Sequence, residues 1–131
     1  FPFPHALPTS GGDRANEFAL QLINARYSPP DDAPIVTFEH AFHGRSSIMK
    51  ALSGGPTTPL SPRVKIVSIP FYSPDHPFAA KDALEKLLKQ QTRPFCLMVE
   101  LFQGEGGFNY APPEFFAELF SSARIPEFPL L

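Results

Sequence analysis

Three segments of this sequence combine residue types that could do chemistry. The first, residues 9–17, places two glycines and Asp13 at the start of an expected helix. Glycines at such a point leave backbone N–H groups accessible, and the helix dipole favours an anion beside them. A phosphate site and an ordinary helix cap both fit this pattern, so the segment alone leaves the choice between them open.

The second segment, residues 39–45, has an aromatic ring and two imidazoles directly after an expected strand. Phe42 offers a face for stacking and His43 a hydrogen-bonding edge, and open α/β sheets bind ligands at the carboxyl ends of their strands. A metal site formed by Glu39, His40 and His43 is an alternative, although no further histidine lies nearby. A structural histidine beside a buried phenylalanine is another.

The third segment, residues 99–107, places two carboxylates in and beside a glycine-rich loop. Glu100 or Glu105 could meet a cationic ring or an arginine, and the other a substrate amine. The loop lacks the Lys-Ser/Thr ending of a nucleoside triphosphate site. The carboxylate pair is only a weak sign of a glycosidase, and the chain has no Gly-x-Ser-x-Gly sequence, which argues against a serine hydrolase.

Composition narrows the class of protein. The 131 residues are 43% hydrophobic and 18% charged with a net charge of −2, which suits one globular unit over 1–131. No run of Lys and Arg could meet a phosphate backbone, so we expect no nucleic-acid partner. No apolar stretch is long enough to span a membrane. The single cysteine, Cys96, lies in an apolar run, and we expect a buried thiol, a reducing compartment and a cytoplasmic protein.

The elements that must position these segments alternate along the chain. The apolar patterns predict four helices and three strands, at 13–27, 46–52, 78–90 and from 112 or 113 onward, and at 35–38, 64–67 and 95–99. Residues 128–131 could begin one more strand. On the helix over 13–27 we expect one buried stripe, formed by Phe18, Leu22 and Ala25 with Ala19 and Ile23 beside them. This order predicts an α/β fold, a mainly parallel sheet with flanking helices.

Taken in order, the three segments resemble motifs of the class III pyridoxal-phosphate aminotransferases, the ornithine and 4-aminobutyrate aminotransferase group. Residues 10–17 match a Ser-Gly-Gly-Ser-Glu-Ala-Asn-Glu type motif, residues 41–45 match Ala-Phe-His-Gly-Arg, and residues 99–107 match Val-Glu-Pro-x-Gln-Gly-Glu-Gly-Gly. The resemblance runs from about Thr9 to the end of the chain. It implies a single partial domain, part of the large cofactor-binding domain of a fold-type-I transferase.

The resemblance also implies roles for residues that would hold pyridoxal 5′-phosphate. Gly12 and Asp13 would offer backbone N–H groups to its phosphate, and Phe42 would stack on its ring. His43 would pack along the edge of the cofactor, and Glu100 would lie near the side of the ring nitrogen. The resemblance is imperfect at Asp13, where the family has Ser or Thr, because like charges would then meet at the phosphate.

On the substrate side, the resemblance makes Glu105 the switch carboxylate that pairs with a substrate-binding arginine, with Gln103 supporting its loop. Arg45 would be a structural ion-pair partner. Leu101 stands where the family has proline, a change that we expect to alter only local stiffness. No metal ligand follows from the resemblance.

By resemblance, the full-length parent would be a homodimer that moves an amino group from an amine or amino acid to a 2-oxo acid. The chain ends at Leu131, near where the family places the aspartate that holds the ring nitrogen and ahead of its Schiff-base lysine. Lys81, Lys86 and Lys89 lie on an expected solvent-facing helix. We therefore expect the chain alone not to catalyse transamination; a non-enzymatic module that binds pyridoxal phosphate or another anion, and a subunit-interaction fragment, are the alternatives.

Overall fold

The computed structural model describes residues 4–55, 64–90, 93–124 and 129–131. Helices and strands alternate through most of it, as the sequence predicts. The elements are α1 (Gly12–Tyr27), β1 (Ile35–Phe38), α2 (Ser47–Leu52), β2 (Ile66–Ile69), α3 (Ala79–Lys89), β3 (Cys96–Leu97), β4 (Phe102–Gln103), β5 (Asn109–Tyr110) and α4 (Pro113–Arg124). The predicted α/β fold is confirmed.

A parallel sheet in the order β2-β1-β3 forms the middle of the molecule. Ile35 of β1 pairs with Ile66 on one side and with Cys96 on the other. Beyond β3, Leu97 forms a parallel bridge with Leu130, so the segment predicted to begin another strand does lie beside the sheet. All four residues of β1 are buried, as expected for the central strand of a parallel sheet covered on both faces.

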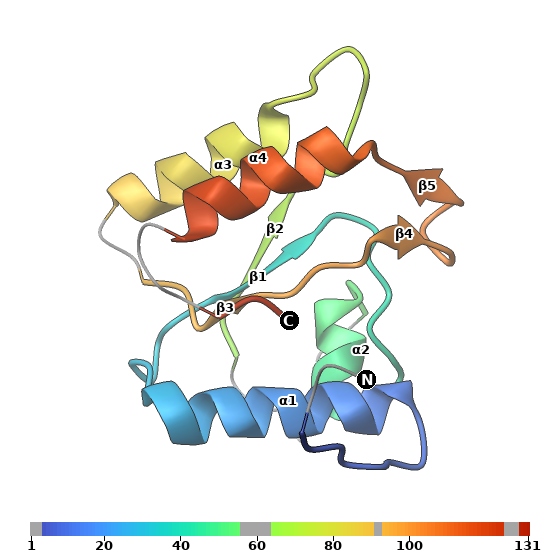
Figure 1. Cartoon of the computed structure of the whole chain (residues 1–131), viewed down its shortest axis with the longest axis vertical. Coiled ribbons are helices and arrows are strands. Elements are labelled where there is room, and N and C mark those ends of the chain that lie inside the picture. Colours follow the sequence, from blue (N-terminus) through green and yellow to red (C-terminus); the bar gives the residue numbers. More distant parts are fainter. Residues whose placement is uncertain (1–3, 56–63, 91–92, 125–128) are drawn as a thin grey trace.

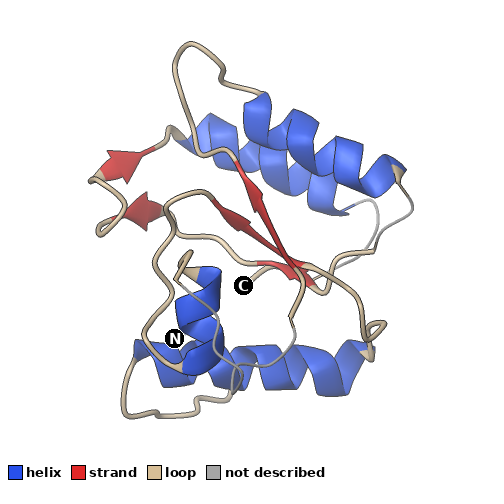
Figure 2. Cartoon of the chain, turned by 180° about the vertical axis from the view of Figure 1, so that it is seen from behind, coloured by secondary structure: helices blue, strands red, loops and turns tan. Residues whose placement is uncertain are grey.

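Helices cover both faces of this sheet. Helices α3 and α4 lie side by side on one face, and α1 and α2 lie on the other (Figures 1 and 2). Each face has its own core, because alternate residues of β1 point to opposite sides: Val36 and Phe38 belong to the core under α3 and α4, and Ile35 to the core over α1 and α2. Within the described residues, no helix combines the length and apolarity needed to cross a bilayer.

The face under α3 and α4 follows the sequence prediction closely. Ala80 and Leu84 of α3 are buried, as are Phe115 and Leu119 of α4. Other predicted residues of the two inner faces pack against this core, namely Ala83, Leu87, Leu88, Phe116 and Phe120. Pro113 is the first residue of α4, where its fixed φ fits the first turn of a helix.

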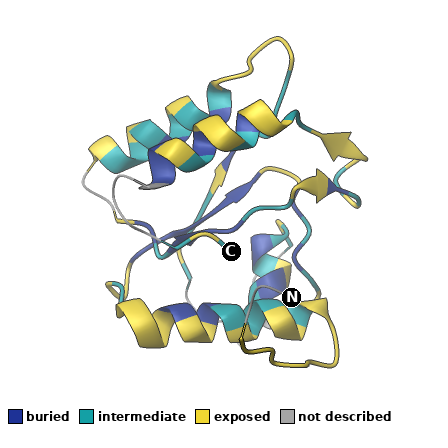
Figure 3. Ribbon diagram, viewed as in Figure 1, coloured by how far each residue is buried: buried dark blue, intermediate teal, exposed yellow. Residues whose placement is uncertain are grey.

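The predicted inner face of α1 is wrong at Phe18, Leu22 and Ala25, and right at Ile23 beside them. Leu20 and Ile23 are buried, whereas Phe18 is 48% exposed and Leu22 55% exposed. Ala25 is exposed as well, and much of the outer side of the helix is open to solvent (Figure 3). The error has a simple cause: α1 carries apolar residues on two opposite sides, so the spacing alone does not tell which side packs on the sheet.

The strand predictions need smaller corrections. Strand β2 begins at Ile66, two residues later than the predicted 64–67. One residue before it, the Lys65 carbonyl already accepts a hydrogen bond from the Ile35 N–H of β1. Strand β3 is two residues long, shorter than the predicted 95–99. The antiparallel pair β4 and β5 was not predicted. The predicted loop over 57–62 and the residue Phe128 lie outside the described residues.

Candidate functional site

The second and third sequence segments meet beyond the carboxyl ends of β1 and β3. The Phe42 N–H donates to Oε2 of Glu100 over 3.1 Å, and the Gln103 side-chain amide donates to the Glu39 carbonyl over 2.7 Å. Gln103 is fully buried. Because these two bonds span about sixty residues of sequence, they fix the loop after β1 against the segment after β3.

The glycine-rich turn between β4 and β5 is held just as closely. Asn109 donates to Oε1 of Gln103 over 3.1 Å and to the Gly106 carbonyl over 3.0 Å. A Cβ atom at Gly106 would collide with the His40 carbonyl oxygen, whereas one at Gly104 would meet nothing within 4 Å. Gly106 is therefore required for the close approach of two backbones, whereas the position of Gly104 has room for a side chain.

The first segment joins the same region through the amino end of α1. The Asn16 side chain donates to the His43 carbonyl over 2.9 Å. Gly44, whose φ is +131°, passes so close to Asp13 that a Cβ there would collide with the Cβ of Asp13. The structure thus brings together all three segments that the sequence singles out.

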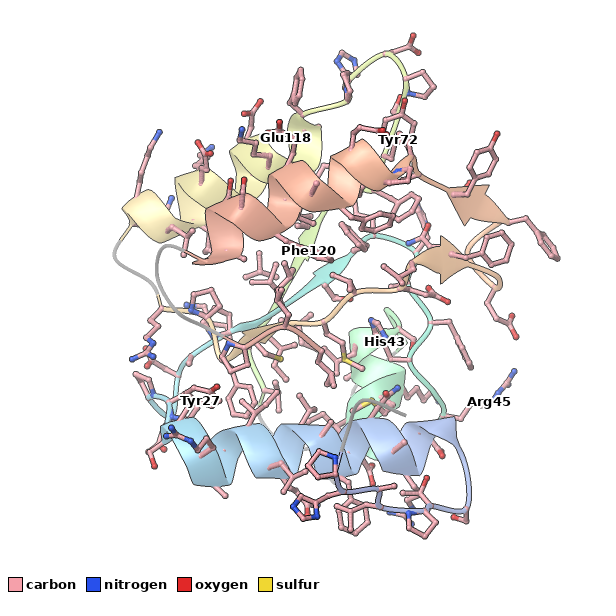
Figure 4. The ribbon with its side chains drawn as sticks, in the orientation of Figure 1. Tyr27, His43, Arg45, Tyr72, Glu118 and Phe120 are labelled. Carbon is pink, nitrogen blue, oxygen red and sulfur yellow. The ribbon has the colours of Figure 1, made fainter. Side chains whose placement is uncertain are left out.

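His43 lies inside the protein and is only 6% exposed. Its Nε2 shares a hydrogen bond of 2.6 Å with Oγ1 of the fully buried Thr37. Burial lowers the pKa of His43 to about 4, so the ring is neutral at pH 7. Figure 4 shows the ring beside α2, turned into the molecule. This geometry favours the structural role over a ligand edge for the imidazole.

Phe42 and the charged side chains beside it lie nearer the surface. The Phe42 ring is half-buried, and the guanidinium carbon of Arg45 lies 5.6 Å from its centroid. Arg45 Nη2 is 3.7 Å from Oε1 of Glu105, and Arg45 extends away from the body of the protein (Figure 4). Both side chains are mostly exposed, so this ion pair contributes little to stability. It places a cation and a carboxylate next to an aromatic face.

At the start of α1, Asp13 uses its own carboxylate as an acceptor. Its Oδ1 accepts the N–H of Arg14 over 2.8 Å, while the Arg14 guanidinium pairs with Glu17 over 2.8 Å. The N–H groups of Gly12 and Asp13 belong to the first turn, where no intrahelical acceptor exists. An anion could bind these donors, but it would share the helix end with a carboxylate.

Two residues that hold His43 in place were not found by the sequence reasoning. Ser53 accepts the His43 N–H over 2.8 Å and donates to the Met49 carbonyl over 2.8 Å, so it ties the loop after β1 to α2. Thr37 holds the His43 ring. A serine after a short helix gives no sequence signal of such a bond. For Thr37 a signal exists: a polar residue within an apolar strand indicates a buried hydrogen bond.

The alternative metal site gains no support. Glu39 and His40 are exposed, while His43 points inward to Thr37. Among the residues that the structure describes, no group of three or more histidine, cysteine or acidic side chains is placed to hold a metal ion. What the region offers chemically is an aromatic face, the N–H groups at the start of α1, and the guanidinium groups of Arg14 and Arg45, each paired with a carboxylate.

Comparison with known proteins matches this arrangement to one family. The family model described as "Aminotransferase class-III" matches residues 2–125. The acetylornithine aminotransferase of Halalkalibacterium halodurans is 31% identical over 112 residues, which are 84% of this chain and 26% of that protein. The diaminobutyrate–2-oxoglutarate transaminase of Streptomyces avermitilis is 36% identical over 129 residues, 90% of this chain and 29% of that protein.

Solved structures agree on the fold. A transaminase from the marine bacterium Virgibacillus superposes with a TM-score of 0.78 at 16% identity, covering 93% of this chain and 29% of the other. A transaminase with pyridoxal phosphate bound superposes with a TM-score of 0.69 at 23% identity, covering 93% and 29%. The chain spans between a quarter and a third of the length of these proteins. Because the family model matches residues 2–125, the chain belongs to the class-III aminotransferase family.

Proposed function

We propose that this chain forms the cofactor-binding part of a pyridoxal-phosphate-dependent transaminase, which moves an amino group from an amine or amino acid to a 2-oxo acid. The observation that carries the proposal is the hydrogen bond from the Phe42 N–H to Glu100. It joins the aromatic segment after β1 to the carboxylate segment after β3, at the edge where parallel sheets bind ligands. The names of the relatives support the same reaction class.

The residues present fit the cofactor with one mismatch. The free N–H groups of Gly12 and Asp13 would receive its phosphate, and the half-buried Phe42 ring would stack on its pyridine ring. Glu100 would fix the stacking ring through the Phe42 backbone. When bound, the cofactor supplies an electron sink for the substrate. The mismatch is the Asp13 carboxylate, which lowers the affinity of this helix end for a phosphate.

His43, which the resemblance places along the edge of the cofactor, would support the site from inside the protein, because its ring is bonded to Thr37. Its backbone is held by Asn16 and by Ser53, and these bonds fix the loop that carries Phe42. On the substrate side, Gln103 would support the turn that carries Glu105. Glu105 faces Arg45 over 3.7 Å, so this exposed carboxylate has a cation from which it could be displaced by a substrate carboxylate.

We further propose that the chain by itself binds the cofactor without turning over. A Schiff base to the cofactor requires an amine in a sheltered, low-dielectric setting. Lys50, Lys65, Lys86 and Lys89 are exposed. Lys81 donates to Glu118 over 2.8 Å, and this bond raises the pKa of its amine. These lysines are therefore poor candidates for the Schiff base. A module that binds the cofactor without catalysis is the second candidate function.

We also propose where the full-length parent is found and how it assembles. We place it in the cytoplasm, in keeping with Cys96, which is fully buried and whose pKa burial raises to about 12. We propose that it is a homodimer, as the resemblance implies. Amino acids or amines and 2-oxo acids would be its substrates.

The proposal is tested by titrating the chain with pyridoxal 5′-phosphate and following absorbance and intrinsic fluorescence. We expect saturable binding that is much weaker for unphosphorylated pyridoxal, because the helix end would contribute through the phosphate. Phe42→Ala should weaken binding at least tenfold, since it removes the stacking face. Phe78→Ala serves as the matched control, because Phe78 is an exposed phenylalanine next to α3 on the other face of the sheet.

Equal loss of binding in both variants, or no saturation with either ligand in a folded chain, would contradict cofactor binding. Borohydride reduction of the mixture, followed by peptide mass spectrometry, tests the second part of the proposal. A specific cofactor adduct on one lysine would show that the chain can form the covalent bond by itself. Adducts spread thinly over the surface lysines, or none, support a module that binds without turnover.

A further inference from the structure

A pocket of about 280 Å³ opens where the amino ends of α3 and α4 meet the loop after β2. Most of its lining is apolar, because three aromatic side chains and two prolines contribute to it, and two carboxylates complete it. The aromatic residues are Tyr72, Phe78 and Phe115, and the carboxylates are Glu114 and Glu118. Figure 4 shows Tyr72 and Glu118 on the side of the sheet that α3 and α4 cover. None of these residues belongs to the three segments that the sequence singles out.

The aromatic side of the pocket is held in place by the core beneath it. Phe115 is only 6% exposed and belongs to the core under α3 and α4. The half-buried Tyr72 ring meets the Phe115 ring at an interplanar angle of 68°, with 5.6 Å between the ring centroids. Phe78 is 56% exposed, so much of its ring is open to a ligand. Such walls suit the apolar part of a ligand, and aromatic faces also attract cations.

One of the two carboxylates in the pocket is left uncompensated. Oε2 of Glu118 lies 2.8 Å from Nζ of Lys81, so this carboxylate is already paired. The Glu114 carboxylate has no ion pair or hydrogen bond in the part of the chain that the structure describes. A carboxylate in the first turn of a helix stabilises that helix by itself, so its charge alone would not indicate a ligand. Its position beside aromatic rings does, because negative charge and aromatic faces favour the same kind of ligand.

We propose that the pocket binds an organic amine in its protonated form, that is, a primary ammonium group on a small apolar body. The ammonium group would pair with Glu114, and the rings of Tyr72 and Phe78 would flank the apolar body. The Tyr72 hydroxyl, which has no hydrogen-bond partner among the described residues, would accept another of the three ammonium protons. The volume is near the lower limit for small-molecule sites, so one ring with a short side chain would fill the pocket.

Titration of the ¹⁵N-labelled chain with benzylamine, protonated at pH 7, tests the binding by NMR. We expect saturation with a dissociation constant on the order of 1 mM, and amide shifts centred on the lining residues. Benzyl alcohol has the same shape without the charge, and should bind about fivefold more weakly. Benzoate should bind more weakly still, because Glu114 repels it. Equal binding of benzylamine and benzyl alcohol would overturn the assignment of a cation site.

The variant Glu114→Gln tests which carboxylate receives the ammonium group. It keeps the size of the side chain and removes the charge, so benzylamine should bind about fivefold more weakly and benzyl alcohol as before. The matched control is Asp82→Asn, an exposed carboxylate in the first turn of α3 that does not line the pocket. Its effect should stay below about twofold. Both side chains are exposed, so neither variant should unfold the chain, and the dispersion of the NMR spectrum checks this.

Two further results of these titrations would overturn the inference. Equal losses in Glu114→Gln and Asp82→Asn would mean that benzylamine responds only to the general negative charge of this end of the molecule. Amide shifts that are centred on Phe42 and Glu105, or scattered without saturation, would mean that benzylamine does not bind in this pocket.

The inference goes beyond the proposed function and does not depend on it, because the pocket shares no lining residue with the cluster of Phe42, Glu100 and Glu105. Benzylamine condenses with the aldehyde of pyridoxal phosphate, so the amine and cofactor titrations use separate samples. A chain that binds the cofactor but not benzylamine overturns this inference alone. A chain that binds benzylamine but not the cofactor overturns the proposed function alone. Phe78 remains a valid control for the cofactor, because Glu114 would repel a phosphate from this pocket.

Discussion

The two faces of the sheet are built from different kinds of side chain. Under α3 and α4 the core contains a cluster of aromatic rings: Phe38 meets Phe71 edge-on at 5.0 Å between ring centroids, and both contact Phe115. Over α1 and α2 the core is aliphatic and sulfur-containing, with Met49, Cys96 and others. The second face also carries the buried Thr37–His43 hydrogen bond.

This difference indicates a division of labour. The face with α3 and α4 fills its interior with apolar contacts and is tied across by surface bonds such as Lys81 to Glu118. The face with α1 and α2 uses polar contacts that hold loops in fixed positions, such as those of Asn16 and Ser53 to the backbone of His43. We infer that the first face supplies mainly stability and the second mainly the geometry of the site.

The largest expected effect comes from a cavity in the core under α3 and α4. Leu119→Ala should lower the free energy of unfolding by about 2–5 kcal/mol, because Leu119 is fully buried and leaves a cavity. Urea unfolding followed by circular dichroism measures the loss. The matched control is Leu22→Ala on α1, where the side chain is 55% exposed and the loss should stay within about 0.5 kcal/mol. Equal losses would contradict the burial of the two leucines.

Acid should affect the other face through His43. Its pKa is about 4 in the folded chain and 6.5 without burial, so the unfolded chain binds the proton more tightly. The stability that this imbalance supports is complete above pH 6.5 and is lost as the pH falls toward 4. Integrated over that window, the loss is on the order of 3 kcal/mol.

Unfolding measured in steps between pH 7 and pH 4 checks this expectation. His43→Gln should flatten the pH dependence, while His76→Gln should leave it unchanged, because His76 is exposed. Proton NMR gives a second readout that does not depend on the stability of the variants. A His43 ring that titrates near pH 6.5 in the folded chain would overturn the argument.

The turn after β4 offers a smaller effect within the site itself. Gly106→Ala should cost about 1–3 kcal/mol of stability and weaken cofactor binding, because its Cβ would collide with the His40 carbonyl and push the two loops apart. Gly104→Ala, in the same turn, meets nothing within 4 Å and should change neither quantity. Equilibrium unfolding and cofactor titration of both variants make the comparison. Identical behaviour would show that the two backbones need no close approach here.

The same contrast explains what the sequence could predict. The helices α3 and α4 were predicted correctly because each has one apolar side, and the 3.6-residue period then determines which side is buried. For α1 the period was right but the side was wrong, because Phe18 and Leu22 form a second apolar line opposite Leu20 and Ile23. Pattern alone cannot rank two apolar sides of one helix.

The site shows a similar division. Its three segments could be found because their residue types and order are unusual, and the structure brings them together. The contacts that hold them could not be found: the Ser53 bond to His43 and the Asn109 bond to Gln103 depend on how the chain folds back on itself. The antiparallel pair of β4 and β5 could not be predicted either, because two-residue strands give no periodic signal in the sequence.

The smallest expected effect concerns the charge at the start of α1. Asp13 accepts the Arg14 N–H there, so an incoming phosphate would meet a carboxylate at a helix end that otherwise attracts anions. Asp13→Ser keeps a side-chain acceptor for this N–H and removes the charge, so it should strengthen pyridoxal-phosphate binding about three- to tenfold, equivalent to about 1 kcal/mol. Titrations at low and high salt measure the gain, which should shrink as salt screens the charge. Asp31→Ser, an exposed change in the loop after α1, is the control and should alter nothing. Weaker binding by Asp13→Ser would contradict this expectation, because it would mean that the carboxylate does not repel the phosphate at this helix end.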